Sequence, residues 1–202
     1  MKYYSTNKQA AKATLQEAVV KGLASDKGLF MPEVIKQLPS SFFEEMKDMS
    51  FQEIAYVVAD AFFGEDVDAA SLKEIVYDTL SFDVPLVHVN DNIYSLELFH
   101  GPTLAFKDVG ARFMSRLLGY FIKKEGQKKV NVLVATSGDT GKAALAGFAD
   151  VPGTKIIVFY PKGGVSKIQE LQMVTQKEEN TFVVGVHGNF DDAQAAVKRL
   201  LG

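Results

Sequence analysis

The chain contains no cysteine, and this absence excludes several kinds of site. Without thiols there is no disulfide scaffold, no zinc–thiolate centre and no cysteine nucleophile. The histidines, His88, His100 and His187, lie far apart in the sequence, and no pair of them has the spacing of metal ligands. The sequence therefore predicts no metal site.

An excess of positive charge is also missing. The net charge is −3, so the sequence lacks the electrostatic signature of a nucleic-acid-binding protein. No apolar run approaches the roughly 20 residues that span a bilayer, and the opening MKYYSTNKQA has no apolar segment of the kind found in secretory signals. We expect neither a nucleic-acid nor a membrane partner, and the cytoplasm is the default location.

The composition that remains, 47% hydrophobic and 23% charged, is typical of a globular protein with a sizeable core. Residues 1–85 are predicted to form a mainly helical N-terminal domain. Ser50 with Glu53 has the spacing of a capping box, and Ser71 is a candidate N-cap. The expected elements are a short strand at 3–6 and helices at 14–23, from 51 and at 70–80.

Residues 86–202 have a different pattern, and we predict an α/β domain there. A hairpin is expected at 86–98, followed by a helix from Thr103 to near Gly126. Apolar runs rich in Val and Ile then alternate with helical segments, which indicates parallel strands buried on both faces and a three-layer arrangement. The predicted strands are 130–135, 155–160 and 181–186, and the predicted helices end near 148, 176 and 201.

A single lysine, Lys107, stands out in the stretch FHGPTLAFKDVGAR, residues 99–112. If the helix begins at Thr103, Lys107 lies one turn from its positive N-terminal end. That end, together with apolar walls from Leu104 and Phe106, disfavours the ammonium form. A neutral lysine is a nucleophile and a base, and it forms a Schiff base with an aldehyde. An ordinary solvated helix lysine is the alternative interpretation.

The loop TSGDTG, residues 136–141, follows the first predicted parallel strand, where ligands bind in open parallel sheets. Its glycines allow backbone N–H groups to approach a ligand, and Ser137 and Thr140 add hydroxyl donors. Asp139 makes the loop a poor phosphate cradle, so a ligand with both an anionic group and a proton-bearing nitrogen fits better. Alternatively, Asp139 or Thr140 only caps the helix. The loop matches neither the nucleoside-triphosphate nor the dinucleotide motif.

The two later loops carry weaker signals. Lys162, in the loop 161–166, could contact a phosphate, although we favour solvent. Asn189 or Asp191 is expected to cap the last helix. His100 could line the same pocket as Lys107, but a hydrogen-bonded structural role is favoured.

Taken together, these motifs resemble a known family. HGPTLAFKD (100–108), followed by ATSGDTG (135–141), resembles the threonine synthases, pyridoxal-phosphate enzymes of the tryptophan-synthase-β-like fold group. GLASDKGLFMPE (22–33), YPKGGVSKIQELQM (160–173) and GNFDDAQAAVK (188–198) resemble further blocks of the same family, in the same order. The resemblance covers nearly the whole chain.

The resemblance implies specific roles. Lys107 is the catalytic lysine that binds pyridoxal 5′-phosphate as a Schiff base, and Ser137, Gly138, Asp139 and Thr140 lie beside the cofactor and the amino-acid substrate. The implied reaction is that of a carbon–oxygen lyase, which converts O-phospho-L-homoserine and water to L-threonine and phosphate. A related lyase for another phospho-amino acid and a non-enzymatic α/β module remain alternatives.

The sequence departs from the family pattern at two residues and in length. Lys27 replaces a usual glycine, so a non-glycine residue must form that turn. Lys142 replaces a small residue, and it lies either at the rim of the site or in solvent. Members of the family are also much longer. We therefore expect a fragment that ends before the larger cofactor domain, is inactive alone, and needs the missing C-terminal domain to complete the site.

Overall fold

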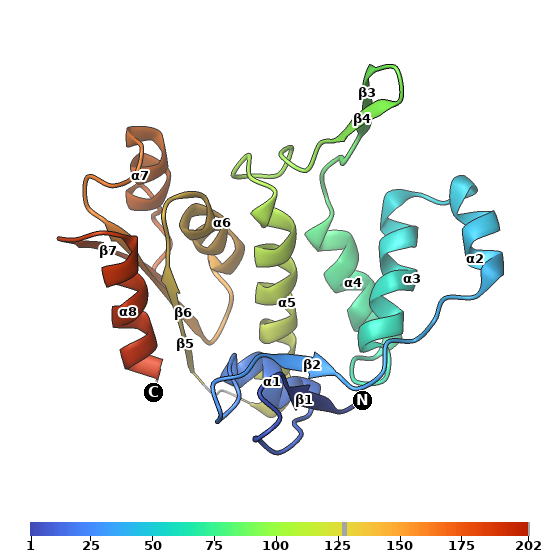
Figure 1. Cartoon of the computed structure of the whole chain (residues 1–202), viewed down its shortest axis with the longest axis horizontal. Helices are drawn as coiled ribbons and strands as arrows, with labels where there is room; N and C mark the ends of the chain where they lie inside the picture. Colours follow the sequence, from blue (N-terminus) through green and yellow to red (C-terminus); the bar gives the residue numbers. More distant parts are fainter. Residues whose placement is uncertain (127–128, 202) are drawn as a thin grey trace. The chain divides into compact units, whose positions relative to one another are not determined.

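A computed structural model of the chain describes residues 1–126 and 129–201 (Figure 1). Gly202, at which the expected fragment ends, lies outside them. The chain divides into two compact units, Met1–Ser81 and Phe82–Gly202, and each is described here by itself. The domain boundary that we expect after residue 85 stays a prediction.

The first unit is mainly helical, and its short strands β1 and β2 pair in an antiparallel ladder. Its core includes Leu72, Val67 and Phe42, which are almost fully buried. The elements are β1 (Tyr3–Ser5), α1 (Leu15–Lys21), β2 (Phe30–Pro32), α2 (Ser40–Glu45), a 3-10 turn (Met46–Asp48), α3 (Phe51–Phe63) and α4 (Ala69–Thr79).

Helix starts in this unit follow local capping chemistry. The capping box of Ser50 and Glu53 at the start of α3 is confirmed, with both reciprocal hydrogen bonds formed. The prediction that Ser71 caps α4 was wrong. Asp68 is the N-cap, because its carboxylate accepts the backbone N–H of Ser71 at 3.0 Å, and α4 begins directly after it.

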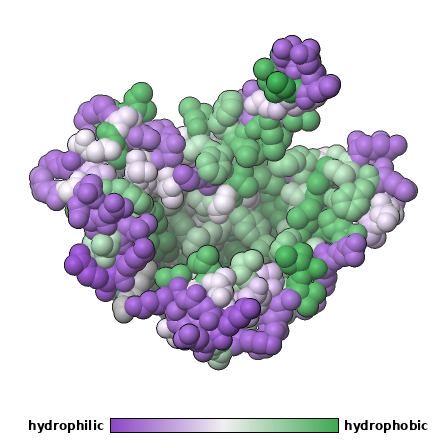
Figure 2. All heavy atoms as spheres, viewed as in Figure 1, coloured by the Kyte–Doolittle hydropathy of each residue, from purple (hydrophilic) through white to green (hydrophobic). Residues whose placement is uncertain are grey.

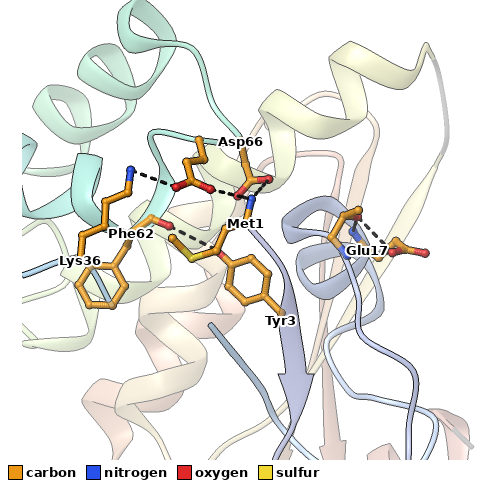
Figure 3. A network of polar contacts seen from close by, with 8 residues as sticks. Met1, Tyr3, Glu17, Lys36, Phe62 and Asp66 are labelled. Atoms are coloured by element: carbon orange, nitrogen blue, oxygen red, sulfur yellow. Dashed lines mark hydrogen bonds and ion pairs between the residues drawn. The ribbon is translucent and has the colours of Figure 1, made fainter. Parts of the chain in front are cut away.

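The N-terminal end of the first unit is held by polar contacts (Figure 3). The Met1 ammonium lies 3.2 Å from carboxylate oxygens of Glu65 and of Asp66. The hydroxyl of Tyr3 donates to the carbonyl of Phe62 at 3.3 Å. Burial, reinforced by the nearby carboxylates, raises the pKa of Tyr3 to about 12. This tyrosine therefore remains a neutral donor throughout the ordinary pH range.

A second polar cluster forms around Asp26. The buried Ser5 donates from its hydroxyl to Asp26 Oδ1 at 2.6 Å, and the N–H of Gly28 donates to the same oxygen at 3.0 Å. Oδ2 accepts the N–H groups of Gln9 and Ala10, each at 2.9 Å. The Ser5 hydrogen bond and these backbone donors lower the pKa of Asp26 to about 2. An ionised Asp26 thus ties the 22–33 turn to β1.

The next residue, Lys27, has a φ of +65°, in the left-handed region that favours glycine. We expect Lys27→Gly to raise the free energy of unfolding by about 0.5–1 kcal/mol, because glycine removes the Cβ penalty of that region and retains part of its own entropy cost. Chemical denaturation measures the change. Lys27→Ala is the matched control: it keeps the Cβ and should give no comparable gain. Equal gains from glycine and alanine would contradict this explanation.

The second unit contains a hairpin and a parallel α/β sheet (Figure 1). Among the described residues of the whole chain there are eight α-helices, and the sheet order is β5-β6-β7, all parallel, so the α/β prediction is confirmed. The elements are β3 (Leu86–Asn90), β4 (Ile93–Leu96), α5 (Lys107–Glu125), β5 (Val130–Ala135), α6 (Asp139–Phe148), β6 (Thr154–Pro161), α7 (Lys167–Val174), β7 (Thr181–Val186) and α8 (Phe190–Leu201).

The core of this unit lies on both faces of the central strand β6. Val158 is fully buried, and it lies close to Gly141 of α6, which in turn lies close to Met173 of α7. Helix α8 contacts β5 and β6 and buries Ala193. The helices and the sheet form three layers, as predicted.

The expectation that all three strands are buried on both faces was wrong for the two edge strands, β5 and β7, whose residues are half-buried or exposed. Phe182 and Val184 are 44% and 41% exposed. The physical reason is position, because both β5 and β7 are edge strands. Helix α8 contacts β5 and β6, and residues 132–134 of β5 line an open cavity. Helix α8 begins as predicted, since Asn189 Oδ1 accepts the N–H of Asp192 at 3.1 Å. No helix in the described part of the chain is both long and apolar enough to cross a membrane.

Candidate active site

The start of α5 differs from the prediction. The helix begins at Lys107, and a helix start at Thr103 was wrong. The carboxylate of Asp108, which is fully buried, accepts the N–H of Thr103 at 2.8 Å and its hydroxyl at 2.6 Å. These bonds fold residues 101–106 back onto the first turn of α5. We call this pair of hydrogen bonds the Asp108 clasp.

Two backbone features accompany the clasp. A Cβ at Gly101 would lie 2.6 Å from Asp108 Oδ2, so only glycine allows the loop to approach the carboxylate this closely. Leu104 has a φ of +58°, an unusual conformation for a bulky residue that costs about 1–2 kcal/mol. Strain of this kind gathers at functional sites, where the surrounding structure maintains it.

Lys107 is half-buried and lines a cavity of about 590 Å³. The other walls come from the segment before α5, from α5, from β5 and from α6, and they are largely apolar; examples are Leu98, Met114 and Val134. The Nζ atom of Lys107 lies 5.1 Å from the ring centroid of Phe106. The segment between β4 and α5 exposes further apolar side chains, visible as green surface in Figure 2. Lys107 therefore lies at the boundary between apolar walls and solvent.

The loop 136–141 is organised by a residue that the sequence reasoning missed. Thr136 is buried, and its hydroxyl oxygen accepts the N–H of Gly138 at 2.9 Å and that of Gly141 at 2.8 Å. The alternative that Asp139 or Thr140 caps α6 was wrong, since these are the first residues inside the helix and Gly138 is its N-cap. The sequence signal was a threonine two residues before a glycine at the end of a strand, which is a common turn pattern.

The glycines of this loop are required by close contacts. Gly138 has a φ of +140°, and a Cβ there would lie 2.5 Å from the side chain of Gln169. A Cβ at Gly141 would lie 2.5 Å from the side chain of Thr136 and 2.9 Å from that of Met173. The loop is therefore fitted closely between β5, α7 and the core.

Lys142 does not point to solvent, so that alternative was wrong. It is 7% exposed, and its Nζ lies 3.2 Å from Asp139 Oδ1. Gln169 Nε2 donates to the same oxygen at 3.0 Å. The pKa of Asp139 is lowered, chiefly by the hydrogen bond from Gln169 and then by that from Lys142. The charge of Lys107 lowers it further. The acidic loop residue is thus compensated by neighbouring positive charge.

The structure brings part of the predicted site together. Lys107 and Thr140 line the same cavity. The positive charge of Lys107 contributes to the lowered pKa of Asp139. Ser137 is exposed and Gly138 is buried, and neither lines the cavity. The functional roles of these residues stay predictions.

The other candidate residues lie elsewhere. His100 is not part of the cavity lining; its Nε2 is 2.7 Å from Glu97 Oε2 in an exposed pair. Lys162 is exposed. No group of three or more His, Asp or Glu side chains able to hold a metal occurs among residues 1–126 and 129–201.

A half-buried lysine on a largely apolar cavity wall beside a parallel sheet is chemically suited to binding a carbonyl compound through its amine. In agreement, residues 82–201 match the family model "Pyridoxal-phosphate dependent enzyme", and the chain belongs to this family. Residues 2–80 match the model "Threonine synthase N terminus". The resemblance to threonine synthases is therefore confirmed over both units.

Individual relatives agree with this assignment. The chain is 41% identical to the threonine synthase of Schizosaccharomyces pombe, over 99% of this chain and 41% of the relative. The solved structure of pyridoxal-phosphate-bound threonine synthase from Brucella melitensis is similar with a TM-score of 0.90 and 36% identity, over 99% of this chain and 44% of that one. Threonine synthase from Escherichia coli gives a TM-score of 0.90 and 36% identity, over 100% and 46%. The chain thus spans less than half the length of these relatives.

Proposed function

We propose that this chain is the lysine-bearing part of a threonine synthase, with Lys107 as the residue that binds pyridoxal 5′-phosphate. The observation that carries the proposal is the position of Lys107 on the wall of the 590 Å³ cavity, at the start of α5. The residues fit the cofactor: a primary amine suits its aldehyde, apolar walls suit its ring, and the volume lies in the range of about 300–1,000 Å³ typical of small-molecule sites.

The chemistry divides between the cofactor and the protein. When bound, pyridoxal phosphate supplies an electron sink for a carbanion at the substrate Cα. The Nζ atom of Lys107 would hold the aldehyde of the cofactor, and it would also move protons at the substrate Cα and Cβ. The Asp108 clasp fixes the backbone from which Lys107 extends. Largely apolar walls surround the cavity that Lys107 lines.

Residues 137–140 contribute the other side of the proposed site. Ser137, Gly138, Asp139 and Thr140 are proposed to lie beside the cofactor and the amino-acid substrate. Thr140 lines the cavity with Lys107, and the bonds from Thr136 hold the loop in shape. The loop can therefore orient a polar ligand without itself changing conformation.

The proposed overall reaction is that of a carbon–oxygen lyase acting in threonine biosynthesis. O-phospho-L-homoserine loses phosphate from Cγ, and water adds at Cβ to give L-threonine. We propose that the C-terminal part present in the relatives completes the site, that the 202-residue chain alone is inactive, and that the protein works in the cytoplasm.

The experiment that tests this proposal compares substrates with the full-length protein. We expect O-phospho-L-homoserine to yield threonine and phosphate in equal amounts, and O-phospho-L-serine to be turned over at least about a hundredfold more slowly, because the site must fit the longer chain in its transition state. Equal or faster turnover of O-phospho-L-serine would favour a related lyase, for which Lys142, paired with Asp139, is the supporting observation.

A further inference from the structure

The start of α6 and the start of α7 are joined through a single carboxylate oxygen. Asp139 Oδ1 accepts a hydrogen bond from Gln169 Nε2 at 3.0 Å and lies 3.2 Å from Lys142 Nζ. Both contacts are made within the second unit, and neither was expected from a sequence motif. The Asp139 carboxylate is thereby held from two directions.

Gln169 is itself oriented by a capping box. Its Oε1 accepts the N–H of Ser166 at 3.0 Å, while the Ser166 hydroxyl oxygen accepts the N–H of Gln169 at 3.2 Å. With Oε1 committed to Ser166, the Nε2 group is left to face Asp139. The side chain also lies against Gly138, where a Cβ would be 2.5 Å away. Gln169 therefore contacts the loop at two consecutive residues.

Lys142 anchors the carboxylate from within the protein. The lysine is 7% exposed, whereas the side chain of Asp139 is 50% exposed. A buried ammonium is costly unless it is paired, so the ion pair with Asp139 stabilises Lys142 in this position. The same pair restrains Asp139, which the charge of Lys107 also reaches.

We propose that Lys142 and Gln169 are positioning residues, which hold the Asp139 carboxylate and so fix residues 137–140 beside Lys107. This inference rests on the proposed function and deepens it, because a fixed loop allows Thr140 and the neighbouring backbone to meet the cofactor and substrate without reorganisation. The two residues act on one oxygen, so their effects are expected to be non-additive.

Hydrogen exchange and pyridoxal-phosphate binding in the full-length protein test the proposal. We expect Lys142→Met and Gln169→Glu each to reduce the protection of the amides of 138–141 by about tenfold, and the cofactor affinity by about fivefold, because each loses a charge-assisted hydrogen bond. Gln169→Glu keeps the acceptor for the Ser166 N–H, so exchange in α7 should not change. Lys167→Met is the matched control, because Lys167 makes an exposed ion pair of the same spacing with Glu170.

Several results would overturn the proposal. Loop exchange equal to that of the wild type in both variants would exclude a positioning role. Faster exchange spread evenly through β6 and α6 would show general destabilisation instead. If Lys107→Ala abolishes covalent cofactor binding while Lys142→Met and Gln169→Glu bind normally, the proposed function stands and this inference fails. If covalent binding persists in Lys107→Ala, the proposed function itself fails.

Discussion

Replacing Lys107 by Ala in the full-length protein is expected to lower threonine formation by at least about 10³-fold. In the proposed mechanism, the variant loses both the amine that would hold the cofactor and the group that would move protons at the substrate carbons. The fold should be preserved, since Lys107 is only half-buried and its Nζ lies 5.1 Å from the centroid of the Phe106 ring. Steady-state assays of threonine and phosphate release measure the effect.

The control for this variant lies on the same helix. Lys123, in the last turn of α5, is exposed and is not part of the Lys107 cavity. Lys123→Ala should retain activity within about twofold, as expected for a surface substitution away from the site. Activity in Lys107→Ala comparable to that of the control would contradict the proposed role of Lys107 and favour a different catalytic residue.

The second large effect concerns the Asp108 clasp. We expect Asp108→Ala to lower the free energy of unfolding by about 3 kcal/mol, because hydrogen bonds to a charged group contribute about 1.5–3 kcal/mol and the buried Thr103 donors lose their acceptor. Both Thr103 bonds depend on Asp108, which is fully buried. Chemical denaturation of the full-length protein measures the loss.

Two matched variants distinguish the effect of losing the Asp108 clasp from the effect of removing a carboxylate at any position. Asp108→Asn keeps one acceptor oxygen and should be intermediate. Asp191→Ala, at an exposed position in the first turn of α8, should change stability by less than about 0.5 kcal/mol. A loss in Asp108→Ala no larger than in Asp191→Ala would show that the clasp contributes little, and that another feature holds the 101–106 loop.

Much of the fold could be predicted because its determinants are local. Strands β5 and β7 have the predicted bounds, since continuous Val- and Ile-rich runs indicate strands without knowledge of distant residues. The capping box at Ser50 is likewise contained in four consecutive residues. The turn at Lys27 was expected from the family pattern, and its φ of +65° confirms that a lysine occupies a conformation suited to glycine.

The parts that could not be predicted depend on side chains from elsewhere. Helix α5 begins at Lys107 and not at Thr103, because the carboxylate of Asp108 accepts the N–H of Thr103. The sequence does not reveal that this carboxylate is buried. The partners of Asp139 include Gln169, which reaches it from the start of another helix. Periodicity and spacing report neighbours along one element, and they do not identify contacts between elements that the sheet brings together.

The central claim is that Lys107 is the cofactor lysine, and peptide mapping after borohydride reduction tests it most directly. The full-length protein is mixed with pyridoxal phosphate, reduced and digested, and the pyridoxyl group is located by mass spectrometry. We predict a single predominant label on Lys107, accompanied by loss of the cofactor absorbance band in Lys107→Ala. A predominant label on Lys142 or on any other lysine, with Lys107 unmodified, would contradict the account.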